Sequence, residues 1–160
     1  MQVSEIMTRE VATVHVDDKA STAARIMWDC DCGALPVPDD AGRAVAIVTD
    51  RDICMATMLQ DRSPSEFPVA LAMSRELQFC LPEHDITTAE QRMREHQIRR
   101  LPVLDADRRL VGIVSVADIA RASGRAKGRK GEIPADEVTA TLIDICAPRS
   151  LAGHPKLELG

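Results

Sequence analysis

The sequence predicts an α+β fold in which two tandem β-α-β-β-α repeats pack sheet to sheet with pseudo-two-fold symmetry. Sliding the chain by 66 positions aligns residues 3–57 with residues 69–123 without a gap, and "AIVTDRDI" (46–53) then falls on "GIVSVADI" (112–119). The matched positions are mostly apolar, as a shared packing plan requires. One unit of about 55 residues buries too little apolar surface to be stable alone. The two halves are therefore expected to share an interface that leaves one cleft per repeat.

A short strand and an amphipathic helix are expected to open each repeat. The strand candidates are "VATVHV" (11–16) and "LQFCLP" (77–82), which have strand-like alternation. Helical spacing predicts helices over Lys19 to about Asp29 and from about Ile86 onward. The buried stripes are predicted to be Ala20, Ala23, Ala24 and Met27 in the first copy, and Ile86, Ala89 and Met93 in the second. Asp17 or Asp18, and Asp85 in the second copy, are the candidate helix N-caps.

Two strands and a second helix complete each repeat. The sequence indicates a strand, a turn and a returning strand in each copy: "ALPVP", "DDAG" and "AVAIVT" in the first, and "LPVLD", "DADR" and "LVGIVS" in the second. Asp and Gly in the connecting segments are typical of tight turns. A helix is then expected from Thr49 to about Gln60, and from Ser115 to about Ser123.

The domain boundaries follow the repeat. Residues 1–62 form the first repeat and 69–123 the second, and 124–160 hold a basic linker, a short C-terminal helix and a tail. The linker composition, "RASGRAKGRKGE", is typical of a flexible segment, with contact to nucleic acid or to an acidic partner as its alternative. Proline followed by acids predicts a helix over Pro134 to about Cys146, with Val138, Leu142 and Ile145 as its apolar stripe. That helix is expected either on the repeats or across a dimer interface.

Composition argues against several functional classes. A net charge of −5 and only three aromatic residues disfavour nucleic-acid binding, and we expect neither a signal peptide nor a membrane span. Five unevenly spaced cysteines suggest free thiols and a cytoplasmic location. Cys30-x-Cys32 resembles half a metal site, but no second pair completes it, so no metal is predicted. Four histidines without a recognisable nucleophile, and no phosphate-binding loop of the Walker type, indicate that the chain is not an enzyme.

The hydroxyl-x-x-Asp sequence at the second helix of each repeat has two interpretations. Thr49 with Asp52, and Ser115 with Asp118, fit a capping box, in which hydroxyl and carboxylate satisfy backbone N–H groups at a helix start. The same atoms suit a ligand, because a helix N-terminus attracts a phosphate and a nearby carboxylate can accept hydrogen bonds from ribose hydroxyls. The occurrence of the pattern at both repeats favours the ligand interpretation.

The ordered set of motifs resembles a CBS domain pair, also called a Bateman module. The resemblance rests on the duplicated β-α-β-β-α unit, "LPV" before a turn, and apolar–apolar–Thr/Ser-x-x-Asp at the last helix, and it covers residues 3–123. It implies a stand-alone regulatory module that binds AMP, ADP, ATP or S-adenosylmethionine as a regulatory ligand, requires no cofactor, forms a homodimer and signals to an unknown effector protein. The alternative is a dimerisation scaffold with vestigial clefts.

The resemblance also implies ligand-binding residues. In the family the hydroxyl meets the phosphate and the Asp meets the ribose. The predicted site residues are Thr49, Asp50, Arg51, Asp52, Ser115, Asp118, Arg99, Arg100, Gly33, Ala34, Val14 and Cys80. Arg99, Arg100 or Arg51 would neutralise a phosphate, and Val14 or Cys80 would border an adenine slot, although both also suit a core. Family members often carry Gly where this chain has Ala46, whereas Gly112 fits, so occupancy is expected to be greater at Ser115 and Asp118.

Overall fold

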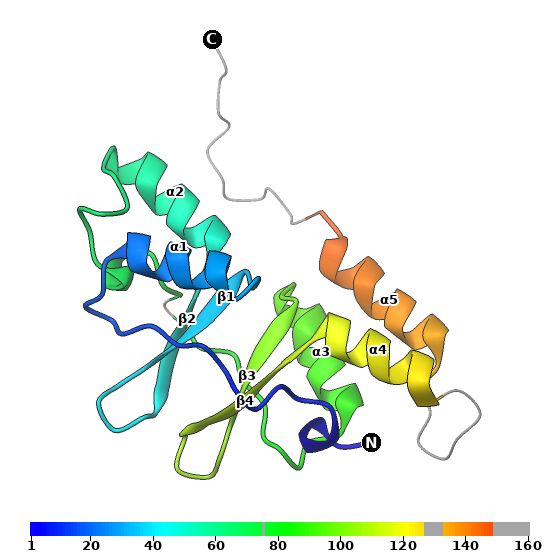
Figure 1. Cartoon of the computed structure of the whole chain (residues 1–160). Helices are drawn as coiled ribbons and strands as arrows, with labels where there is room; N and C mark the ends of the chain where they lie inside the picture. The colour runs from blue at the N-terminus through cyan, green and yellow to red at the C-terminus, as the bar shows by residue number, and fades with distance from the viewer. Residues whose placement is uncertain (75, 127–132, 149–160) are drawn as a thin grey trace.

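The computed structural model describes residues 1–74, 76–126 and 133–148, and Figure 1 shows the whole chain. The first repeat contains α1 (Ala20–Asp29), β1 (Ala34–Pro38), β2 (Ala44–Thr49) and α2 (Asp50–Gln60). The second contains α3 (Ile86–His96), β3 (Arg100–Leu104), β4 (Leu110–Ser115) and α4 (Val116–Ala126). Short 3-10 helices, η1 (Val3–Glu5) and η2 (Val69–Leu71), precede α1 and α3, and α5 (Ala135–Cys146) follows α4. The repeated α+β architecture predicted from the sequence is confirmed.

The two β-hairpins are built alike. β1 pairs antiparallel with β2, and β3 pairs antiparallel with β4, so that Leu35 faces Val48 and, 66 positions later, Leu101 faces Val114. Asp39 explains the shared turn, because its carboxylate accepts the N–H groups of Ala41 and Arg43. Asp105 does the same for the N–H groups two and four residues ahead. The hairpins meet near their tips, where Ala44 donates to Arg108 and Leu110 donates to Gly42.

The predicted opening strands at residues 11–16 and 77–82 are wrong as strand assignments. Both segments are extended beside a hairpin but make few ladder bonds. The Val14 N–H donates to the Pro36 carbonyl, and Cys80 bridges Val103 through bonds with Pro102 and Leu104. Proline at 36 and 102 has no N–H to return, which limits pairing along this edge. The hairpins therefore remain two-stranded, each flanked by an extended segment.

Each hydrophobic core contains residues from the segment that precedes the helices of the other repeat in the chain. Val3 and Met7, from the start of the chain, lie in the core of the second repeat. Phe67 and Val69, from the connection between the repeats, lie in the core of the first. Backbone hydrogen bonds fix both segments in these positions. The Val3 N–H donates to the His84 carbonyl, and the Ala20 N–H donates to the Phe67 carbonyl. The connection between repeats is therefore partly structural, because Phe67 is fully buried.

The helices match the predicted ranges, but their capping differs from expectation. Neither Asp17 nor Asp18 caps α1, whose N-cap is Lys19 without a side-chain bond. Asp18 instead accepts the N–H of His15, which tightens the preceding turn. Asp85 occupies the N-cap of α3 as predicted, again without a side-chain bond. The predicted stripes are buried except for Ala24, which is exposed.

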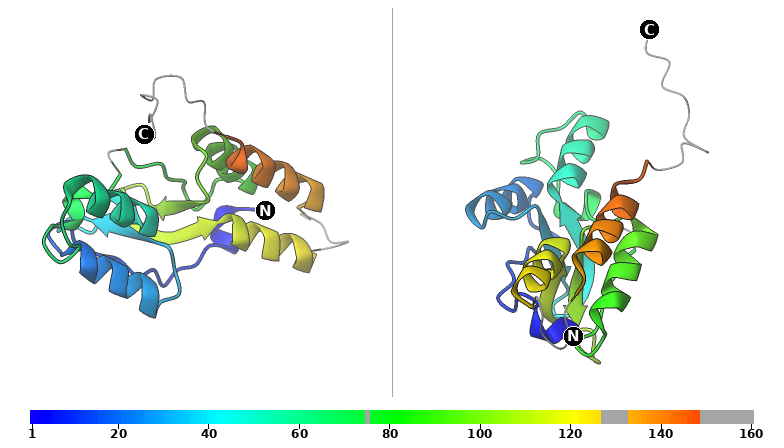
Figure 2. Two further views of the ribbon diagram at one scale, coloured as in Figure 1. Left: turned by 90° about the horizontal axis from the view of Figure 1, so that it is seen from above. Right: turned by 90° about the vertical axis from the view of Figure 1, so that its right-hand side faces the viewer.

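The C-terminal helix α5 packs on the second repeat, against α3 and α4 (Figures 1 and 2). Val138 and Ile145 join the core there, as the predicted stripe requires. Leu142 does not, and the fully buried Thr141 takes its place on the inner face. The predicted basic linker and tail lie largely outside the described residues. Among the residues that are described, no helix is long and apolar enough to cross a membrane.

Candidate functional site

Both hydroxyl-x-x-Asp sequences form capping boxes. At α2 the Thr49 N–H and Oγ1 donate to Asp52 Oδ2 at 2.9 and 2.7 Å, and Thr49 Oγ1 accepts the Asp52 N–H at 3.1 Å. At α4 the Ser115 N–H and Oγ donate to Asp118 Oδ2 at 2.8 and 2.6 Å, and the Asp118 N–H donates back at 3.3 Å. These bonds explain why each β-strand turns directly into a helix at this point. The two boxes are nearly identical locally, so any difference in function must come from their surroundings.

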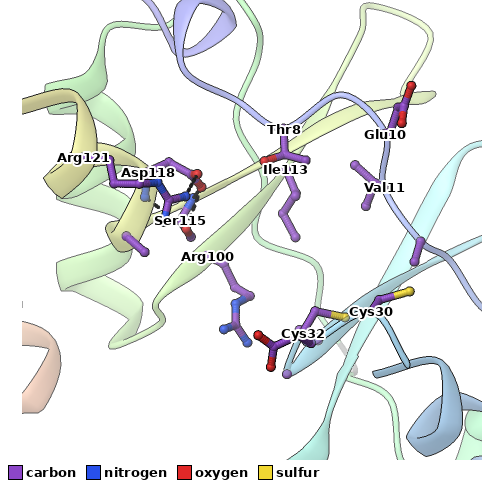
Figure 3. Close-up of a pocket in the computed structure, with 15 residues that line it drawn as sticks. Thr8, Glu10, Val11, Cys30, Cys32, Arg100, Ile113, Ser115, Asp118 and Arg121 are labelled. Carbon is purple, nitrogen blue, oxygen red and sulfur yellow. Dashed lines mark hydrogen bonds and ion pairs between the residues drawn. The ribbon is translucent and has the colours of Figure 1, made fainter. Parts of the chain in front are cut away.

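A cavity of about 690 Å³ lies beside the second capping box and between the two repeats (Figure 3). Ser115, Asp118 and Arg121 form one side, and residues 30–34 of the first repeat form the other. Figure 3 shows Arg100 between these sides, and Thr8 and Val11 on the segment that runs past them. Volumes of this size are typical of small-molecule sites. The cavity exists only because the repeats meet, since neither repeat contributes both sides.

Arg121 distinguishes the second capping box from the first. Its guanidinium donates to Asp118 Oδ1. Arg121 follows Asp118 by three positions, about one helical turn, so the two side chains share a face of α4. Asp118 is largely buried, and its two oxygens accept from Ser115 and from Arg121. The corresponding residue on α2 is Met55, which has no charge to offer Asp52. A ligand hydroxyl that binds Asp118 therefore has to compete with Arg121.

Gly33 permits a close approach of charged groups across the repeat interface. A Cβ placed there would lie 3.1 Å from Asp50 Oδ2 and 3.3 Å from Arg100 Nη1. Arg100 starts β3 in the second repeat but reaches the backbone of the first. Its charge and the N-terminus of α4 give the cavity two features that attract an anion. Glu10 and Asp31 also line the cavity, so its charge is mixed.

Five of the predicted site residues line this cavity: Gly33, Ala34, Arg100, Ser115 and Asp118. Gly33 and Asp50 also line a second cavity of about 410 Å³ between α1 and α2. Thr49, Arg51, Asp52 and Arg99 line neither of these two cavities. The sequence-based preference for the second capping box thus agrees with where the larger cavity lies, and ligand occupancy itself stays a prediction.

Val14 and Cys80 lie in the hydrophobic cores and line neither cavity. Burial raises the pKa of the Cys80 thiol to about 12. The apolar side chains that border the larger cavity include Val11, Ala12 and Ile113, with Ala34 and Ala117 beside them. The extended segment at 11–16 therefore reaches the cavity through Val11 and Ala12, whereas the predicted Val14 lies in the core.

Sequence reasoning missed several lining residues, among them Thr8, Glu10, Cys30 and Arg121. Arg121 had a readable signal, because it follows Asp118 by three helical positions and so shares its face. Thr8 and Glu10 had none, since they enter the site only through the exchange of the N-terminal segment between repeats. Cys30 and Cys32 both line the cavity, and burial raises the pKa of the Cys32 thiol. In the described part of the chain, no three His, Cys, Asp or Glu side chains are grouped to hold a metal ion.

Comparison with known proteins agrees with this architecture. The family model described as "CBS domain" matches residues 3–58 and 67–125. The CBS domain-containing protein YhcV of Bacillus subtilis is 41% identical over 118 residues, covering 74% of this chain and 82% of that protein. Homoserine O-acetyltransferase of Methanococcoides burtonii is 35% identical over 122 residues, but these are only 24% of its length. The similarity to that enzyme is thus confined to a part of it.

A solved structure shares both the fold and the repeat arrangement. The CBS domain pair of protein MJ0100, in complex with 5'-methylthioadenosine and S-adenosyl-L-methionine, superimposes with a TM-score of 0.71 at 27% identity, covering 78% of this chain and 97% of that one. The match includes both repeats in their mutual arrangement, which is the arrangement that creates the 690 Å³ cavity. With its duplicated unit, paired capping boxes and family match over both halves, this chain belongs to the CBS domain family.

Proposed function

We propose that this chain is a regulatory module that binds an adenosine-containing ligand in the cavity between its repeats. The observation that carries the proposal is the convergence of Ser115, Asp118 and Arg100 on one cavity of suitable volume. The structural neighbour that binds two adenosyl compounds supports the ligand class. AMP, ADP, ATP and S-adenosylmethionine are the compounds to test.

Each part of such a ligand has a matching group in the cavity. The Asp118 carboxylate suits a ribose, because it can accept hydrogen bonds from both hydroxyls. Arg100 and the positive end of the α4 dipole suit a phosphate, while the Ser115, Val116 and Asp118 N–H groups are already bonded within the protein. Val11, Ala12 and Ile113 offer apolar contact to the flat base. The proposed role is regulatory and not catalytic, and the signal would pass to a partner protein or through a homodimer.

Calorimetry with AMP, ADP, ATP, S-adenosylmethionine and 5'-methylthioadenosine tests the proposal. We expect binding of at least one compound, and Asp118→Ala to weaken it by about tenfold or more, since hydrogen bonds to a charged group contribute about 1.5–3 kcal/mol. Asp52→Ala is the matched control, because it removes the same capping carboxylate at a box that lines neither cavity. Equal loss in both variants would contradict the assignment of the site.

A scaffold without a ligand is the second candidate. The observation that favours it is that Ser115 and Arg121 already engage both carboxylate oxygens of Asp118. A thermal shift separates the two functions: a binder is stabilised by its ligand through mass action. An unchanged melting temperature with every compound would support the scaffold.

A further inference from the structure

A carboxyl group is buried where α5 packs on the second repeat. α5 contacts both α3 and α4 (Figures 1 and 2), and the Glu90 side chain on α3 is 0% exposed beneath it. Glu90 Oε1 accepts a hydrogen bond from the Thr141 hydroxyl of α5 at 3.1 Å, whereas Glu90 Oε2 has no hydrogen-bond partner among the described residues. A charged carboxylate with one unpaired oxygen is costly at such a position.

A second carboxyl group faces Glu90 from the other helix. Glu137, in the first turn of α5, adds its negative charge to the larger effect of burial, and both raise the pKa of Glu90. Arg94, one turn further along α3, lowers that pKa. β3 also packs on α3, but its one charged residue, Arg100, reaches toward the first repeat. Two carboxyl groups that approach each other in a buried interface share a proton more readily than they both ionise.

The rest of the α5 interface is held by contacts that do not titrate. Gln97 Nε2, beyond the end of α3, donates to the carbonyls of Asp144 and Ala147 at 3.3 and 2.8 Å. Val138 and Ile145 pack into the core of the second repeat. The energy of these contacts does not depend on a proton, so the carboxyl pair at the start of α5 is the contact through which pH acts.

We propose that α5 is a proton-dependent cover on the second repeat, which stays docked while the Glu90–Glu137 pair holds a proton and detaches from α3 more often once the pair has lost it. Detachment lets water reach Glu90 and separates two negative charges, so ionisation favours the open form. The docked form holds the proton more tightly. Its advantage is therefore full below the ordinary glutamate pKa of about 4.3 and declines as the pH rises through the raised pKa of Glu90.

The first repeat lacks the group that would give it this response. Its equivalent of Glu90 is Ala24, which is exposed. The proton dependence is therefore confined to the second repeat, and α1 serves as a reference within the same molecule. The inference does not depend on a bound ligand.

Hydrogen–deuterium exchange of the whole chain, followed by mass spectrometry between pH 5 and pH 8, tests the cover. After correction for the pH dependence of the intrinsic exchange rate, protection of the α5 amides is expected to fall about tenfold across this range, because one unit of pKa difference corresponds to a factor of ten. Protection of α1 should stay constant, which shows that the chain remains folded. Glu90→Gln is neutral at every pH and is expected to keep α5 equally protected at both ends of the range.

Glu137 and its neighbour provide a matched pair of variants. Glu137→Gln should reduce the fall in α5 protection without abolishing it, since the burial of Glu90 remains. Glu137 is only half-buried, so this variant tests the pair even where Glu90→Gln disturbs folding. Asp136→Asn removes an exposed acid from the same first turn, with the same loss of interaction with the helix dipole, and should behave like the wild type.

Three results would overturn the proposal. The first is α5 protection that does not change with pH in the wild type. The second is an undiminished fall in Glu90→Gln, which would place the titrating group elsewhere. The third is a Glu137→Gln variant that cannot be distinguished from Asp136→Asn, because the two carboxyl groups would then not act as a pair.

Discussion

The two repeats share their hairpin register and capping boxes, yet they differ where other segments approach them. In the second repeat the Thr8 N–H and carbonyl both bond to Ile113, at 2.9 Å each. In the first, the Ser74 N–H donates to the Ile47 carbonyl, but the Ile47 N–H donates to the Ser74 hydroxyl and not to its backbone. One backbone bond has been replaced by a side-chain bond.

A single methyl group accounts for this difference. A Cβ at Gly112 would lie 2.8 Å from Met7 Sδ and 2.9 Å from the Thr8 carbonyl oxygen, closer than real contacts allow. The equivalent residue, Ala46, has that methyl and keeps it fully buried in the first core. The Ala46 methyl therefore affects the segment that crosses its strand, where Ser74 takes the place of Thr8. Glycine lets the N-terminal segment approach closely enough for Thr8 to border the cavity.

Among the substitutions considered, placing a methyl group at Gly112 is expected to have the largest effect on stability. Gly112→Ala forces the crossing segment away and is expected to lower the free energy of unfolding by about 2 kcal/mol, the usual cost of overpacking. Ala46→Gly is the matched variant and should cost about 1 kcal/mol, because it removes a buried methyl and loosens a strand. Denaturant unfolding measures both. A neutral Gly112→Ala would show that the segment can shift freely and would refute the close-approach argument.

Glu90 is expected to make a smaller contribution to the free energy of unfolding, and this contribution depends on pH. Burial raises the pKa of this carboxyl, and Glu137 on α5 adds to the shift, whereas Thr141 and Arg94 lower it. Because the pKa is higher in the folded chain, the folded state holds the proton more tightly. This contribution is fully present below the unfolded pKa of about 4.3 and is lost as the pH rises through the folded pKa.

Glu90→Gln should remove that pH dependence. The amide resembles the protonated acid and can still accept from Thr141, so the variant is expected to be more stable than the wild type at neutral pH by about 1 kcal/mol. Parallel unfolding curves across the acidic and neutral range measure this. Ala24 occupies the same position on the uncovered face of the first repeat, so Ala24→Gln is the control and should leave the pH slope unchanged. A persistent slope in Glu90→Gln would assign the effect to another group.

Arg121→Met should have the smallest effect, on the ligand and not on the fold. It gives the second capping box the residue that the first box has at Met55. Freeing Asp118 Oδ1 is expected to raise the affinity for 5'-methylthioadenosine by about twofold to fivefold, the range that a partly exposed ion pair contributes. The same change removes a cation and is expected to weaken ATP binding. Competition binding with the two compounds compares these outcomes, and a shift in the same direction for both would contradict the competition between Arg121 and the ligand.

Much of the architecture was predictable because it is local and duplicated. The 66-residue offset marks both repeats, helical spacing places the buried stripes, and Ser115 with Asp118 marks a helix start whatever lies around it. The hydroxyl and carboxylate meet within one helical turn, so their bond follows from their spacing. The strand assignments at 11–16 and 77–82 were wrong because they depend on non-local contacts. Whether an extended segment becomes a strand depends on the neighbour that it meets, and here prolines limit the pairing.

Tertiary structure decided which of two equal motifs borders the larger cavity. Thr49 with Asp52 and Ser115 with Asp118 carry the same local information, but of the two pairs only the second lines the larger cavity, beside Arg100 and facing residues 30–34 across the repeat interface. Tertiary structure also decided that α5 covers one helix pair and leaves the other open. Contacts of this kind join residues that are far apart in the chain, and their geometry depends on packing that no local pattern encodes.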